Sequence, residues 1–187
     1  MNSINPKERD LYLFKAIDPS DGVVKELISA INNINRDDAF LVKKAELLNL
    51  VYTPAPINLY INSPGGSVYA MFALIDAIKK SAVPVHTINA GLAASAAGLV
   101  LMAGKHRACY ENSTVMIHGV SGAAFGFTED IKDKVSEMDR LQTKLINFIY
   151  THSGISMPKL NEVVEYKKDW YVDATESLRH GIVDQII

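Results

Sequence analysis

Three short stretches of the chain place glycine or other small residues beside groups that can take part in acyl transfer. Ser63–Gly66 reads SPGG, Gly91–Gly98 reads GLAASAAG around a single hydroxyl at Ser95, and VMIH ends in the imidazole of His118. A hydroxyl, an imidazole and free backbone N–H groups are the nucleophile, general base and oxyanion donors of an acyl-transfer site. A serine at a helix start also lies where free N–H groups and the helix dipole favour developing negative charge.

Each stretch also has a purely structural interpretation. Small residues such as those of GLAASAAG allow tight helix packing, and SPGG is an ordinary turn signal. A histidine that ends an apolar strand is most often a hydrogen-bonded, half-buried side chain. For any one stretch the structural interpretation is favoured. All three follow strand ends, however, and in a parallel sheet ligands bind at the carboxyl ends of the strands, so together they predict one site.

The elements that must position these groups alternate between short apolar runs and helical patterns, which predicts an α/β fold with a largely parallel sheet. The predicted strands are Leu11–Ile17, Ile57–Ile61, Val83–Ala90, Arg107–Glu111, Thr114–His118 and Ile182–Ile187. The predicted helices are Val24–Ile34 with a cap at Asp18 or Ser20, Lys43–Leu50, Val68–Ile78, one starting at Gly91, Thr128–His152, one starting near Pro158, and one capped by Asp173 and ending at Gly181.

Composition excludes several classes of protein. The 187 residues fit one domain, and 19 Lys+Arg against 21 Asp+Glu leave no basic surface suited to nucleic acid. The longest apolar run is too rich in Gly, Ala and Ser for a membrane span, and the first ten residues lack the apolar core of a secretory signal. Cys109 is the only cysteine, so an intrachain disulfide and a cysteine-based metal site are excluded. A cytoplasmic location is expected.

Four motifs occur in the order and at about the spacing found in ClpP, the proteolytic subunit of the Clp protease. They are INLYINSPGGSV, GLAASAAG, VMIHG and DWYVDATESLRHGIVDQI, and the resemblance runs from about Leu11 to Ile187. GLAASAAG and the tryptophan of DWYV also resemble the ClpP-like prohead proteases of tailed phages. The resemblance implies a ClpP/crotonase-like fold with flanking helices and a protruding handle helix. It implies a single peptidase domain over 1–187, with the handle region at about 119–154.

The resemblance also implies roles for individual residues. Ser95 matches the nucleophile of the family, His118 its general base and Asp169 the triad aspartate. The backbone N–H groups of Gly66 and Ala96 match the oxyanion donors. The family usually has Met at the position of Ala96, but a backbone donor does not depend on the side chain.

The triad aspartate has two competitors close in sequence. Asp173 has the capping-box spacing to Glu176, so a capping role explains it without catalysis. Asp184 is close to the C-terminus and has the position of a residue at a strand end. Local chemistry alone does not choose among them, and the resemblance favours Asp169.

The stretch after His118 resembles the substrate-lining strand and handle of the family. Strand addition of a substrate is expected along Ser121, Gly122, Ala123, Ala124 and Phe125, and the following helix is expected to stack two rings face to face. A flexible loop before an ordinary amphipathic helix is the alternative. The chain departs from the family at Gly119-Val120, where Gln-Pro is usual, and in Asp37–Pro56, which is about a dozen residues longer than usual.

The sequence therefore predicts a serine endopeptidase that hydrolyses peptide bonds inside a self-assembled ring. The resemblance implies a homo-oligomer, either a heptamer or a double heptamer, which takes peptides or unfolded protein and has an AAA+ unfoldase as a candidate partner. No metal and no cofactor of its own is expected. Two alternatives stay open: a crotonase-type acyl-CoA enzyme, which shares the fold and the backbone oxyanion hole, and a catalytically silent ring subunit.

Overall fold

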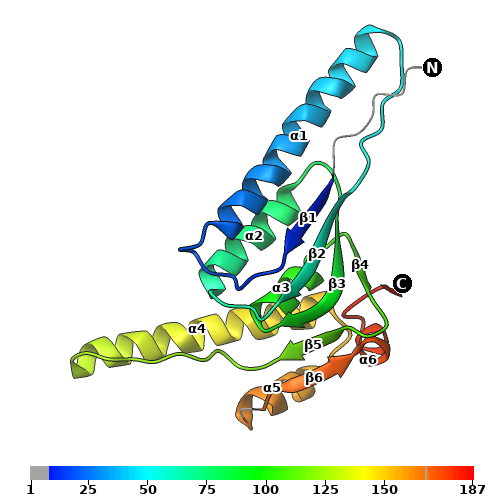
Figure 1. Ribbon diagram of the computed structural model, residues 1–187. Coiled ribbons are helices and arrows are strands. Elements are labelled where there is room, and N and C mark those ends of the chain that lie inside the picture. The colour runs from blue at the N-terminus through cyan, green and yellow to red at the C-terminus, as the bar shows by residue number, and fades with distance from the viewer. Residues whose placement is uncertain (1–8, 167) are drawn as a thin grey trace.

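The computed structural model describes residues 9–166 and 168–187, which form an α/β fold of one mixed sheet with flanking helices (Figure 1). The expectation about a secretory signal falls mainly on residues 1–8, which lie outside the described residues. The strands are β1 Asp10–Leu13, β2 Ile57–Ser63, β3 Val85–Ala94, β4 His106–Cys109, β5 Thr114–Ile117, β6 Trp170–Asp173 and β7 Gln185–Ile186. The helices are α1 Val23–Leu47, α2 Val68–Lys80, α3 Ala96–Met102, α4 Thr128–His152, α5 Met157–Glu165 and α6 Ala174–Arg179.

The sheet is mostly parallel, as predicted. Five strands lie side by side in the order β1, β2, β3, β4 and β7, and each neighbouring pair is parallel. Strand β5 pairs parallel with the second half of β3, and β6 is antiparallel to β5. Strand β3 therefore has β4 as its neighbour along its first half and β5 along its second half.

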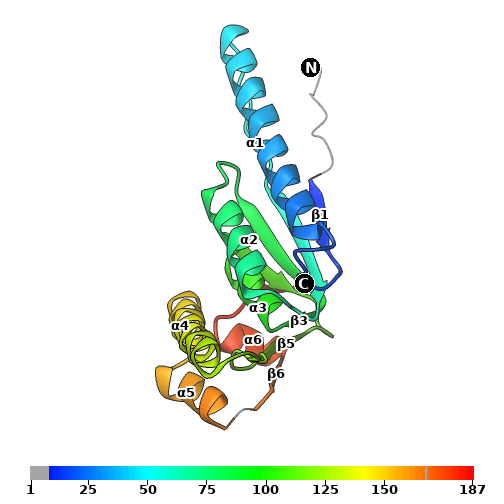
Figure 2. The ribbon, with the colours of Figure 1, turned by 90° about the vertical axis from the view of Figure 1, so that its left-hand side faces the viewer.

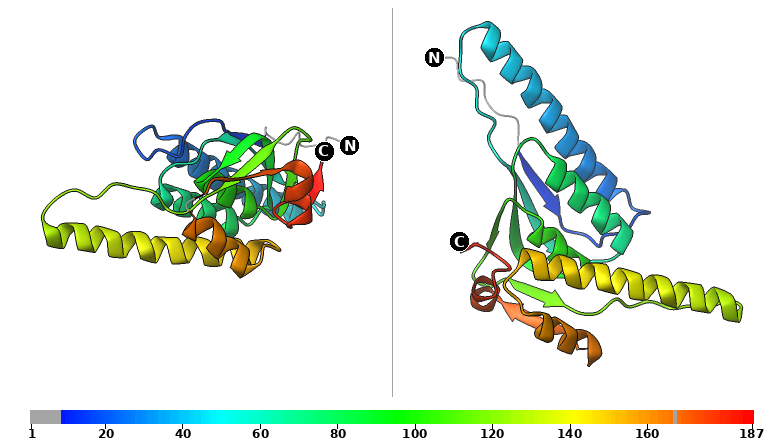
Figure 3. Two further views of the ribbon diagram at one scale, coloured as in Figure 1. Left: turned by 90° about the horizontal axis from the view of Figure 1, so that it is seen from below. Right: turned by 180° about the vertical axis from the view of Figure 1, so that it is seen from behind.

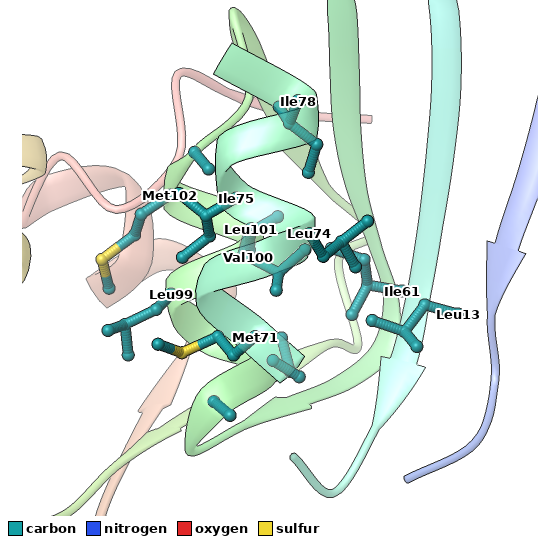
Figure 4. Close-up of a cluster of buried hydrophobic side chains, with 14 of the residues drawn as sticks. Leu13, Ile61, Met71, Leu74, Ile75, Ile78, Leu99, Val100, Leu101 and Met102 are labelled. Atoms are coloured by element: carbon teal, nitrogen blue, oxygen red, sulfur yellow. The ribbon is translucent and has the colours of Figure 1, made fainter. Parts of the chain in front are cut away.

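Helices α1, α2 and α3 cover one face of the sheet (Figure 2). Along β2 the residues that face these helices are buried, whereas the alternate residues Asn58, Tyr60 and Asn62 are partly or fully exposed. This period of two is typical of a strand with one covered face. The core between the helices and the sheet is apolar (Figure 4); it includes Leu13, Ile61, Met71, Leu74, Ile75, Ile78, Leu99, Val100, Leu101 and Met102.

The start of the chain differs from the prediction at two points. The first strand ends at Leu13 instead of Ile17, although Ile17 is buried and forms an isolated bridge with Gly66. The first helix is capped by neither Asp18 nor Ser20. Its N-cap is Gly22 in the left-handed conformation, and Asp18 instead accepts hydrogen bonds from the Ser20 N–H and hydroxyl in a local turn.

The predicted helix at Lys43–Leu50 is not a separate element. It continues α1, which runs unbroken over 25 residues and extends beyond the sheet (Figure 1). A buried ion pair anchors this extension: Asp38 accepts hydrogen bonds from Arg9 at 2.6 and 2.7 Å and from the Tyr52 hydroxyl at 2.7 Å. The three groups join the middle of α1 to the chain before β1 and to the returning loop, so the extension is held on two sides.

Strand β6 is not among the predicted strands, and the other elements agree closely with the prediction. Helix α4 has the predicted bounds, α5 begins one residue before Pro158, and Asp173 caps α6 by accepting from the Glu176 N–H at 2.7 Å. The last strand is shorter than expected, with only Gln185 and Ile186 paired to β4. In the described part of the chain, no helix combines the length and the hydropathy that crossing a membrane requires.

The ion pair between Arg9 and Asp38 yields a stability prediction. Arg9→Met should lower the free energy of unfolding by about 3 kcal/mol, because it leaves a buried carboxylate without its charged partner. Hydrogen bonding by Arg9 holds the pKa of Asp38 below its ordinary value, so the pair stabilises the fold at neutral pH. That contribution is lost as the pH falls below about 4 toward the folded-state pKa, so the two proteins should converge in acid. Urea denaturation at pH 7 and pH 3 measures both effects.

Arg36→Met is the matched control, because Arg36 is an exposed arginine on α1, the helix that carries Asp38. It should change stability by less than about 0.5 kcal/mol at either pH. A loss equal to that of Arg9→Met would contradict a specific role for the buried pair.

Candidate active site

Ser95 occupies the turn between β3 and α3. The prediction that the helix starts at Gly91 is wrong, because Gly91–Ala94 continue β3 and the helix begins at Ala96. The strand is longer than its sequence suggests because Leu92, Ala93 and Ala94 pair with β5. Ser95 is the N-cap of α3, as expected for a serine at a helix start, but its side chain caps no backbone N–H.

The backbone at Ser95 is in an uncommon conformation. Ser95 has φ 54° and ψ −124°. Ser95 and Asn49 are the two non-glycine residues of positive φ in the described part of the chain. Such conformations persist where surrounding structure enforces them, and they concentrate at functional sites. Here the Ser95 N–H donates to Met116 O at 2.8 Å, which fixes the turn to β5 and leaves the hydroxyl free to point elsewhere.

The glycine pair of SPGG packs directly against this turn. Gly65 has φ +90°, and a Cβ added there would lie 2.5 Å from Ala94 O and 2.9 Å from Ser95 Cβ, so only glycine fits. At Gly66 an added Cβ would lie 2.5 Å from Ile17 O. The Gly65 carbonyl and the Ser67 N–H both bond Ile17. In this parallel bridge the N–H of Gly66 therefore points away from Ile17.

His118 lies beside Ser95. It follows the last residue of β5, and its Nε2 is 2.8 Å from Ser95 Oγ. The two groups are brought together by sheet pairing, because Ala94 is the β3 partner of Met116, and Ser95 and His118 follow these partners closely. The pairing of strands that are distant in sequence thus creates a serine–imidazole hydrogen bond.

A small cavity of about 50 Å³ opens at the serine and the histidine. Gly66 and Ala96 border it together with Ser95 and His118. Ala96 is the first residue of α3, so its N–H has no carbonyl partner within the helix. The remaining lining is largely apolar and includes Val68, Leu99, Ile117, Val120 and Leu145. The cavity therefore combines a nucleophile–base pair and two candidate backbone donors with apolar walls.

Asp169 lies near His118 without bonding to it. Trp170 is the β6 partner of Ile117, so the antiparallel register places Asp169 opposite His118. Residues opposite each other in such a ladder have Cβ atoms about 5 Å apart. Both residues line a second, larger cavity of about 530 Å³. Asp169 is exposed, and no hydrogen bond joins it to His118 in the described part of the chain.

The two competing aspartates have structural partners. Asp173 caps α6, as the capping-box spacing predicts. Asp184 accepts hydrogen bonds from Arg107, both from the backbone N–H at 2.9 Å and from the guanidinium. Neither borders the cavities that His118 lines.

The segment after His118 runs alongside α4, and both extend away from the sheet (Figure 3). No residue of 118–127 is assigned to a strand, and most of Ser121–Phe127 is exposed. Gln142 of α4 accepts a hydrogen bond from Val120 N–H at 2.5 Å, and Lys134 donates to Phe125 O at 2.7 Å. Strand addition of a substrate along Ser121–Phe125 stays a prediction.

Sequence reasoning singled out the SPGG stretch but gave Gly65 no role of its own, and it missed Gln142. Gly65 has a detectable signal, since a glycine pair that ends a strand indicates a close backbone approach. Gln142 has no such signal, because a single glutamine in the sequence of an amphipathic helix cannot be distinguished from a solvent-exposed one. Across residues 9–166 and 168–187, no three side chains of His, Cys, Asp or Glu are grouped so that they could hold a metal ion.

The contact of Gly65 with the Ser95 turn yields a prediction with a matched control. Gly65→Ala should lower the free energy of unfolding by about 2–4 kcal/mol, because the new Cβ meets backbone atoms at a left-handed φ. Gly122→Ala should change it by less than about 1 kcal/mol, since the nearest atom is Met138 Cε at 3.5 Å. Urea denaturation followed by the fluorescence of Trp170 compares the two. Equal stabilities would contradict the close approach at Gly65.

Comparison with known proteins gives the family of the chain. A family model described as Clp protease matches residues 15–187. The ATP-dependent Clp protease proteolytic subunit 1 of Salinibacter ruber is 32% identical over 177 residues, which are 92% of this chain and 75% of the relative. Subunit 2 of Treponema pallidum is 33% identical over 79% of this chain and 74% of its own length. The proteolytic subunit of Deinococcus radiodurans is 34% identical over 79% and 72%. The chain belongs to the Clp protease family.

Proposed function

We propose that this chain is a serine endopeptidase in which Ser95 attacks the peptide carbonyl and His118 acts as general base. The observation that carries the proposal is the 2.8 Å hydrogen bond between His118 Nε2 and Ser95 Oγ. This distance is within the reach that direct proton transfer requires. Membership of the Clp protease family supports peptide bonds as the substrate.

The reaction proceeds through an acyl-enzyme. His118 takes the Ser95 proton as Oγ attacks, and then returns it to the leaving amine. The backbone N–H groups of Gly66 and Ala96 stabilise the oxyanion, an assignment supported by their place at the same cavity and by the free N–H at the start of α3. Water then releases the acyl group by the same proton transfers. These steps involve only groups of the chain, the substrate and water.

Asp169 is the proposed third member of the triad. Its position opposite His118 in the β5–β6 register supports the assignment, and the structural roles of Asp173 and Asp184 argue against these two competitors. Because Asp169 is exposed and does not bond His118 in the isolated subunit, we propose that assembly brings the carboxylate and the imidazole together. The carboxylate would then hold the imidazole in the tautomer that accepts the serine proton.

Assembly into a ring is supported by apolar surface that the subunit leaves uncovered. Phe125 and Phe127 are 77% and 86% exposed, and Ile131 and Val135 of α4 are exposed as well. An apolar patch of this kind marks an interaction site. A heptamer or double heptamer, with α4 between subunits and the catalytic groups facing an inner chamber, would cover it. Delivery of unfolded protein by an AAA+ unfoldase is part of the same proposal, and ATP would be used by that partner alone.

The alternatives predict different chemistry. A crotonase-type acyl-CoA enzyme has no use for a serine–imidazole hydrogen bond, so the observed pair argues against it. A catalytically silent ring subunit is the second candidate, and one observation favours it: the absence of a bond between Asp169 and His118 in the described part of the chain. Reactivity of the serine separates it from a peptidase.

The first functional prediction concerns Ser95. A fluorophosphonate probe should label the wild-type chain at Ser95, with the label concentrated in the assembled fractions of a gel-filtration profile. Ser95→Ala should abolish labelling and peptide hydrolysis while leaving assembly intact. Labelling and peptide mapping by mass spectrometry measure these outcomes.

Ser29→Ala is the control, because Ser29 is an exposed serine on α1 far along the chain from the site. It should be labelled as the wild type is. An assembled wild-type chain that resists the probe would favour the silent subunit, and labelling of Ser95→Ala would remove the proposed nucleophile.

The second functional prediction separates Asp169 from Asp173. Asp169→Asn should lower kcat for a short peptide by roughly 10²- to 10⁴-fold, because the imidazole loses its orienting carboxylate, and it should leave stability unchanged. Asp173→Ala should lower the free energy of unfolding by about 1 kcal/mol through loss of the α6 cap, with kcat retained. The reverse pattern in steady-state kinetics and urea denaturation would assign the triad position to Asp173.

A further inference from the structure

We infer that Gln142, on the handle helix α4, is a positioning residue for His118. This inference rests on the proposed function, because it concerns the alignment of the proposed base. Gln142 touches neither Ser95 nor His118 through any hydrogen bond of the described chain. It acts on the backbone two residues beyond the imidazole, where its Oε1 accepts the Val120 N–H at 2.5 Å.

The hydrogen bond at Val120 restrains the backbone just after His118. The pairing of β5 with β6 ends at Ile117 and Trp170, so the backbone of His118 is held on its N-terminal side by the sheet. Over residues 118–126, the hydrogen bonds to backbone groups in the described chain come from α4 side chains. The bond at Val120 is the first of them. His118 and Gly119 are therefore a two-residue span fixed by the sheet on one side and by Gln142 on the other.

Glycine at position 119 leaves space for the Gln142 side chain to reach the Val120 N–H. A Cβ added at Gly119 would lie 3.1 Å from Gln142 Oε1, closer than ordinary van der Waals contact. Glycine at this position lets the amide oxygen reach the next N–H. Val120 also packs against the hydrophobic core and borders the small cavity beside Ser95 and His118, so a shift of its backbone would move a wall of that cavity.

The helix that carries Gln142 is firmly seated at this point. Its neighbour Leu141 and Leu145, which follows about one helical turn later, are both buried in the core. Gln142 itself is half-buried, and no hydrogen bond of the described chain involves its amide nitrogen. The side chain is therefore used as an acceptor. Loss of the acceptor would leave a partly buried N–H without a partner and release the chain after His118.

The test compares Gln142→Met, which keeps the length of the side chain and removes the acceptor, with Gln142→Glu, which keeps an acceptor oxygen. Gln142→Met should lower kcat for a short peptide and the rate of fluorophosphonate labelling by about 3- to 10-fold, with KM little changed. Gln142→Glu should restore most of both. Asn147→Met, which removes an exposed amide from the same helix, is the control and should match the wild type.

Amide hydrogen exchange supplies a readout that does not depend on activity. The Val120 N–H should exchange more slowly in the wild type and in Gln142→Glu than in Gln142→Met, at equal global stability and equal ring size. A wild-type labelling rate in Gln142→Met, or a Gln142→Glu variant as slow as Gln142→Met, overturns the inference. A wild-type chain that is not labelled at Ser95 defeats the proposed function, and the exchange comparison still reports whether Gln142 holds Val120.

Discussion

The candidate site depends on one strand having two different neighbours along the same edge. The first half of β3 pairs with β4, and its second half pairs with β5. This change of partner places the end of β5 beside the end of β3, which brings His118 to Ser95. The turn at Ser95 is then fixed by its N–H bond to Met116 and by the close approach of Gly65. Without the pairing of β3 with β5, the serine and the imidazole would have no reason to meet.

Much of the site could be predicted from the sequence because its parts are short and local. Ser95, His118 and the glycine pair each follow a strand, and strand ends converge at one edge of a parallel sheet. The boundary between β3 and α3 could not be predicted in the same way. Gly91–Ala94 consists of small residues that suit a helix as well as a strand, and a distant partner, β5, decides the matter. Here tertiary pairing overrides local preference.

The long α1 and the role of Gln142 lie beyond sequence reasoning for a related physical reason. The pattern near Lys43–Leu50 indicates a helix but not its continuity with the helix that begins at Val23. The ion pair that anchors the extension joins residues 29 positions apart, and Arg9 lies before the first strand. Gln142 likewise acts on a backbone 22 positions away. Interactions over such separations leave no periodic signal in a single sequence.

The exposure of α4 changes along its length, and this gradient has a consequence for how the chain matures. The buried residues of the helix in the described structure are Leu141, Leu145 and Ile149, all in its second half. The first half carries exposed Ile131 and Val135 and receives little support from its own subunit. A helix with so few buried side chains is only marginally stable by itself in water, so the ring assembly proposed above would add the contacts that hold its first half. Under that proposal a newly made chain would complete α4 only when other copies are present, so the concentration of the protein would set the moment at which folding ends.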